Sequence, residues 1–127
     1  MTKTYLPDFD VEVVETKNGS YKVIFEEENC AIYLDSERVQ EVVQKSSEEP
    51  EFVAVLIAYI EFIYRNTINK NHRVRKISEN EIAETIVSLT NALAIEEVIY
   101  KFKELKWHEI QMIVGSSDPA STLNEMV

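Results

Sequence analysis

One segment, residues 51–65, constrains the fold of this chain more than any other. Nine consecutive apolar residues, Phe52 to Ile60, are followed by Glu61 and then by three more apolar residues. If this segment is a helix, apolar side chains cover most of its circumference, so the helix must be buried in the protein core. It is too short and too interrupted to cross a bilayer, which needs about 20 apolar residues. We therefore expect a central helix that begins at Pro50, a position where a first helical turn tolerates proline.

The central helix has one stripe that lacks large apolar side chains. This stripe runs through Ala54, Ala58, Glu61 and Arg65, which are spaced three or four residues apart. The two alanines allow a neighbouring element to approach closely. Glu61 and Arg65 lie one helical turn apart, in the order that favours an ion pair. We expect the Ala54 end to pack tightly under a neighbour and the Arg65 end to reach solvent.

Alternating apolar and polar residues before the central helix predict a β-hairpin. The alternation runs over residues 9–13 and again over residues 21–26, on either side of Lys17-Asn18-Gly19. A three-residue loop at 17–19 pairs Val13 with Val23 and makes one face of the hairpin cleanly apolar. A two-residue turn would mix the two faces, because a slip of one residue moves every side chain to the other side. The glycine of the loop would then adopt the left-handed conformation of a bulge.

The other segments predict one more strand and three more helices. Residues 31–34 are expected to form a third strand, and Asp35 or Ser36 to cap a helix. A capping box at Ser78 and Glu81 begins the next helix, and a last helix ends at Gly115. No glycine or proline separates these last two helices, so we expect them to be nearly continuous. Residues 1–8 are expected to be an irregular lead-in and residues 116–127 a loosely held tail.

These elements predict the α+β class, in a single domain over residues 1–127. A β-hairpin or three-stranded meander at the N-terminus is followed by a four-helix, helix-dominated core. A length of 127 residues with 45% hydrophobic content is enough for one domain with a real core.

The net charge of −10 is unevenly distributed along the chain. Residues 1–51 hold 13 acidic against 5 basic residues, and residues 52–127 hold 10 against 8. An acidic chain is attracted to basic protein surfaces and repelled by nucleic acid and anionic membranes. Solubility is the alternative explanation of this charge. The single cysteine, Cys30, and the lack of an N-terminal hydrophobic segment favour the cytoplasm, or the host cytoplasm if the protein is viral.

No pattern in the sequence predicts catalysis. His72 and His108 lie far apart in the chain, and Cys30 has no potential metal ligand nearby. With only two glycines, the chain has no loop that could cradle phosphates. We therefore expect no enzyme activity, no cofactor and no metal site.

Two groups of residues are candidates for contact with a protein partner. The acidic candidates are Asp10, Glu12, Glu26, Glu27 and Glu28. The apolar candidates are Trp107, Ile110 and Val114, which form a stripe away from the core-facing side of the last helix. Tryptophan is favoured at interface hot spots, so this stripe could bind a partner or a second copy of the chain. Alternatively, the last helix is covered on two sides within the monomer.

A basic segment is the alternative candidate site, for nucleic acid. It contains Arg65, Lys70, His72, Arg73, Arg75 and Lys76, and no acidic residue lies between Glu61 and Glu79. Such a patch could neutralise phosphates. However, no aromatic residue lies within 66–76 to stack on bases. We therefore favour a solvated loop and do not expect nucleic acid to be the main partner.

Together these observations predict a small, acidic, intracellular interaction module, which is a non-catalytic inhibitor or regulator. Its acidic residues would dock on a basic protein surface that otherwise binds nucleic acid. In charge and size the chain resembles phage-encoded inhibitors of nucleases, which mimic the charge of phosphates. The alternatives are a nucleic-acid-binding regulator that uses the basic segment, or an assembly or scaffold subunit of a larger complex, such as a phage complex.

Overall fold

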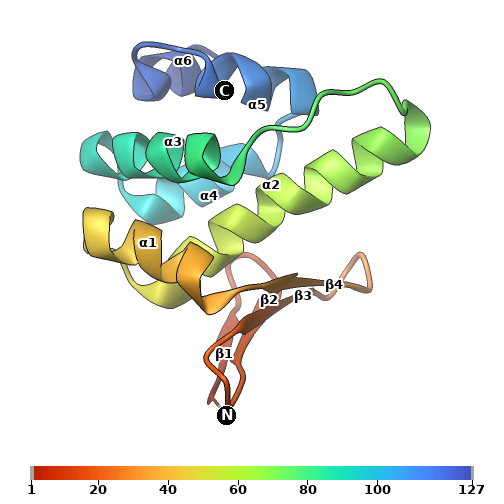
Figure 1. Ribbon diagram of the computed structural model, residues 1–127, viewed down its shortest axis with the longest axis vertical. Helices are drawn as coiled ribbons and strands as arrows, with labels where there is room; N and C mark the ends of the chain where they lie inside the picture. Colours follow the sequence, from red (N-terminus) through yellow and green to blue (C-terminus); the bar gives the residue numbers. More distant parts are fainter. Residues whose placement is uncertain (1, 127) are drawn as a thin grey trace.

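The chain folds into an antiparallel sheet that is covered by layers of helices (Figure 1). The computed structural model describes residues 2–126, which form four strands and then six helices. The strands are β1 (Thr2–Leu6), β2 (Val11–Glu15), β3 (Tyr21–Phe25) and β4 (Cys30–Leu34). The helices are α1 (Ser36–Ser46), α2 (Pro50–Lys70), α3 (Glu79–Ala92), α4 (Ile95–Phe102), α5 (Trp107–Val114) and α6 (Pro119–Met126). The predicted α+β class with a helix-dominated core is confirmed.

The sheet has the order β1-β2-β3-β4 and contains the predicted hairpin. Val13 pairs with Val23 and Glu15 with Tyr21, which is the register of the three-residue loop. Gly19 has a φ of 85°, so a glycine is needed there to avoid the steric cost of a Cβ. The hairpin prediction is therefore confirmed in its pairing and in its turn.

The prediction of an irregular lead-in is wrong for the residues that the structure describes. Residues 2–6 form strand β1, which pairs with β2 along its whole length. All side chains of β1 are exposed or half-buried, so backbone hydrogen bonds hold the strand more than apolar burial does. An edge strand of this kind has no clear apolar alternation in its sequence, and this explains the error.

The central helix α2 lies between the sheet and the other helices (Figure 1). All residues from Val53 to Ile60 are buried. Ala54 is fully buried and Arg65 is exposed, as predicted. Glu61, however, does not pair with Arg65 but with Arg38 of α1, and their Oε1 and Nη2 atoms are 2.8 Å apart.

The second half of the chain forms more and shorter helices than predicted. Leu93 and Ala94 have extended backbones, with ψ angles of 152° and 138°, so α3 and α4 are separate helices. The single last helix that was predicted is divided into α4 and α5 by residues 103–106. Gly115 does cap α5, as predicted.

The described part of the predicted loose tail, residues 116–126, is also structured. Pro119 is the first residue of α6, and the side chain of Asp118 accepts hydrogen bonds from the backbone and the hydroxyl of Ser121. Leu123 is completely buried. In Figure 1, α6 lies beside α5 at the top of the molecule, above α3. The tail is therefore part of the core.

Candidate binding surfaces

The acidic residues of two turns lie together at one end of the sheet. Residues 7–10 connect β1 to β2, and residues 26–29 connect β3 to β4. The backbone N–H of Glu26 donates to the carbonyl of Asp10 at 3.3 Å, so the two turns are bonded to each other. Asp10 and Asn29 both adopt the left-handed conformation, which short polar residues tolerate in turns. The structure thus brings together Asp8, Asp10, Glu26, Glu27 and Glu28, which we call the acidic end.

The acidic end borders a hollow of about 350 Å³. Its lining includes four of the carboxylates, the ring of Tyr59 and one cation, Lys103. The pKa of Tyr59 is raised to about 12, chiefly by burial and also by the negative charges of Glu28, Glu27 and Asp10. Each of these effects disfavours the phenolate, and the carboxylates do so through the negative potential that they create. The hollow is therefore suited to a cationic group.

Glu12, which was predicted to belong to the same surface, does not line this hollow. It lies in the middle of β2, opposite Tyr5 and Ile24 of the neighbouring strands. Tyr5 instead donates its hydroxyl to Asp10 at 2.8 Å, and this bond fixes the carboxylate at the end of the first turn.

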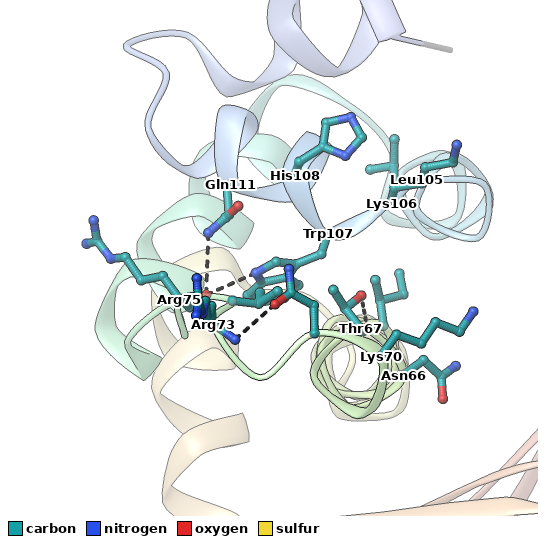
Figure 2. A pocket seen from close by; sticks show the side chains of 13 residues that line it. Asn66, Thr67, Lys70, Arg73, Arg75, Leu105, Lys106, Trp107, His108 and Gln111 are labelled. Atoms are coloured by element: carbon teal, nitrogen blue, oxygen red, sulfur yellow. Dashed lines mark hydrogen bonds between the residues drawn. The ribbon is translucent and has the colours of Figure 1, made fainter.

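Basic side chains surround a second and larger cavity, of about 690 Å³ (Figure 2). It lies between the C-terminal half of α2, the segment after it and the start of α5. The basic side chains that line it are Lys70, Arg73, Arg75, Lys106 and His108. None of the described residues that line this cavity is acidic. We call this cavity the basic pocket.

The basic pocket includes only part of the predicted basic segment. Arg65 and His72 are exposed and do not line the pocket. The ammonium of Lys76 lies 5.9 Å from the centre of the Tyr64 ring, outside the pocket lining. Lys106 and His108 were not predicted as members of this site. The available signal was their position on either side of Trp107, but nothing in the sequence shows that α5 lies beside residues 70–75.

Trp107 lines the basic pocket but is buried, so it does not provide a free contact surface. It is 4% exposed, and its indole N–H donates to the carbonyl of Arg75 at 3.0 Å. Its ring packs against Tyr64, with 4.9 Å between the ring centres. Figure 2 shows that Gln111 donates to the same carbonyl, so two side chains of α5 hold the segment in place.

Of the two alternatives for this apolar stripe, the structure agrees with cover of the last helix within the monomer and not with a free contact surface. Trp107 and Ile110 are buried, and only Val114 is partly exposed. The sequence allowed for such cover within the chain but did not show which elements would provide it. These neighbours are α6, α3 and the segment that follows α2.

Residues 2–126 offer few other features that suggest chemistry. No group of three or more His, Cys, Asp or Glu side chains among them is arranged to hold a metal ion. Cys30 is a half-buried free thiol on β4. None of the helices in this range has the length and apolar content of a membrane span. Comparison of the chain with protein-family models, curated proteins and solved structures finds no match.

Proposed function

We propose that this protein is a non-catalytic interaction module whose acidic end docks on a basic protein surface. The observation that supports this proposal is the hydrogen bond between Glu26 and Asp10, because it holds two acidic turns side by side. Glu26, Glu27 and Glu28 are exposed, so their charges remain available to a partner. A partner that normally binds the phosphates of nucleic acid offers the matching charge.

The arrangement favours electrostatic recognition over a large apolar contact. Neighbouring carboxylates repel one another in the free protein, and a cationic surface relieves this repulsion. Complementary charge of this kind speeds encounter and selects the partner more than it adds raw affinity. Binding through the acidic end should therefore weaken strongly with salt.

A fluorescent arginine-rich peptide is a suitable probe for this proposal. The test variant combines Glu26→Gln, Glu27→Gln and Glu28→Gln. We expect its affinity for the peptide at low salt to fall by about tenfold, with a smaller dependence on salt. The control variant changes three exposed glutamates on α1, α4 and α6 to glutamine, and thus the net charge by the same amount: Glu37, Glu96 and Glu125. If the test variant keeps both the affinity and the salt dependence, the proposal is wrong.

A nucleic-acid-binding regulator is the second candidate function. The basic pocket supports it, because cations from two separate segments converge there without a neighbouring acid in the lining. Trp107 is too buried to stack on bases, so phosphate contacts would have to provide the affinity. A mobility-shift assay with duplex DNA and with single-stranded RNA at about 50 mM salt tests this candidate, since phosphate contacts are strong at low salt. Absence of any shift would exclude it.

A further inference from the structure

The acidic hollow and the basic pocket adjoin each other along one face of α2. Tyr59, Phe62 and Ile63 line the acidic hollow, whereas Ile63, Asn66, Thr67 and Lys70 line the basic pocket. These residues follow one another at alternating intervals of three and one, so they lie on one side of the helix. Ile63 lines both cavities and marks the boundary between them. At about 1.5 Å per residue, this face extends for about 16 Å between Tyr59 and Lys70.

This face has opposite charges on its two sides. The side towards Tyr59 carries four of the carboxylates of the acidic end, with Lys103 as the one cation in the lining. The side towards Lys70 is lined by basic and neutral side chains. Figure 1 shows the β3–β4 turn and the C-terminal end of α2 on the same side of the molecule. Half-buried apolar residues, Phe62 and Ile63, lie between the two charged regions.

A surface that is acidic on one side and basic on the other is complementary to itself under a two-fold rotation. In a two-fold dimer, each residue that contacts a second residue across the interface is contacted by it in return. If the axis passes near Ile63, the two α2 helices cross in opposite directions. Each acidic end then faces the basic pocket of the other copy, and both favourable contacts form. A parallel arrangement would place like charges together.

We infer that the protein forms a two-fold dimer in which the acidic end of each copy occupies the basic pocket of the other. This inference rests on the proposed function, because it identifies the basic protein surface as that of a second copy. Two chains with a net charge of −10 repel each other at long range. At physiological ionic strength this repulsion is screened beyond about 8 Å, and the complementary contacts at short range then decide the association.

Charge reversal on each half of the face provides a sharp test. In the first variant, Glu27→Lys and Glu28→Lys give the face as a whole a net positive charge. In the second variant, Arg73→Glu and Lys106→Glu give it a net negative charge. The mass of each full-length protein is measured by light scattering over a range of concentrations, and circular dichroism checks that each variant is folded. A matched control reverses two exposed glutamates elsewhere, Glu37→Lys and Glu96→Lys.

We expect the wild type and the control to be dimers and each charge-reversed variant to be a monomer. When the two variants are mixed, they should form a heterodimer, because a face of net positive charge then meets a face of net negative charge. A wild type that stays monomeric at every concentration overturns the inference. Variants that remain dimers on their own also overturn it, because their dimer must use another surface.

A cross-linking experiment tests the position of the axis without changing any charge. Residues close to a two-fold axis lie close to their own copies in the other protomer. An Ile63→Cys substitution in a Cys30→Ser background should therefore form an intermolecular disulfide under mild oxidation, since disulfides need Cα atoms within about 7 Å. A Lys17→Cys substitution in the same background, in the exposed β2–β3 loop, should not form an intermolecular disulfide. Failure of Ile63→Cys to cross-link contradicts the proposed axis.

These outcomes separate the dimer from the proposed function. If the wild type is a monomer but loses affinity for the arginine-rich peptide when Glu26, Glu27 and Glu28 are neutralised, the acidic end binds other proteins only. If the wild type dimerises as inferred and the neutralised variant binds the peptide unchanged, the acidic end serves self-association alone.

Discussion

The ion pair between Arg38 and Glu61 provides a demanding test of the fold. Each side chain is only 13% exposed, and the Nη2 and Oε1 atoms are 2.8 Å apart. Glu79, the first residue of α3, lies 3.9 Å from the guanidinium but is 66% exposed. One guanidinium thus connects α1, α2 and α3. Its Nε is buried and makes no hydrogen bond within the described residues.

Removal of either partner should destabilise the protein, whereas removal of both should not. A Glu61→Leu change leaves the charge of the half-buried Arg38 with Glu79 as its weak remaining partner. Breaking a buried pair on one side costs about 3–5 kcal/mol, and an exposed ion pair returns about 0–1 kcal/mol. We therefore expect a loss of about 3 kcal/mol for Glu61→Leu and a similar loss for Arg38→Met. The double variant should lie within about 1 kcal/mol of the wild type, because apolar side chains of similar size replace both charges.

Urea unfolding at pH 7, followed by circular dichroism, measures these free energies. The control is Arg65→Met on the same helix, which should change the stability by less than about 0.5 kcal/mol because Arg65 is exposed. Losses of less than about 1 kcal/mol in both single variants would refute a strongly coupled buried pair. Equally, a double variant whose loss equals the sum of the two single losses would show that the groups are independent.

Three further predictions concern the core, the basic pocket and the acidic hollow. Leu123→Ala should destabilise the protein by about 2–5 kcal/mol in urea unfolding, because the side chain is fully buried in the core. Trp107→Phe removes the hydrogen bond to Arg75, so we expect a loss of about 1 kcal/mol and faster amide hydrogen exchange in the segment around Arg75. Burial raises the pKa of Tyr59 from 10.0 to about 12, so the folded state keeps a proton that the unfolded chain releases. Stability should therefore fall between pH 10 and about 12, and Tyr59→Phe should reduce this fall.

Local patterns in the sequence were enough to predict the central helix and the hairpin. Residues 52–60 are apolar without interruption, and only a buried helix satisfies such a segment at this length. The hairpin register followed from the alternation of side chains and from one glycine, because each constrains only residues that are near in sequence. The burial of Ala54 and the exposure of Arg65 were predicted for the same reason, from positions on a single helix.

Non-local contacts decided the features that sequence reasoning missed. Strand β1 is held by backbone hydrogen bonds to β2. Backbone hydrogen bonds do not require a periodic pattern of apolar side chains, so the sequence does not show them. Glu61 has a neighbour one turn away in Arg65, yet it pairs with Arg38, which is 23 positions away in the chain. Helix α6 and the buried state of Trp107 depend on how α5 packs, and the apolar stripe of α5 alone cannot show whether it meets its own chain or a partner.

The candidate binding surfaces also depend partly on local sequence and partly on tertiary contacts. The sequence by itself determined that acidic residues gather at 26–28 and basic residues at 65–76. Only the tertiary structure bonded the turn of Asp10 to that of Glu26, and only it placed Lys106 and His108 in the same pocket as Arg73. The physical reason is that charge is a property of each residue, whereas a binding surface depends on distances between residues of different elements. Those distances follow from how α2 packs against the sheet and α5.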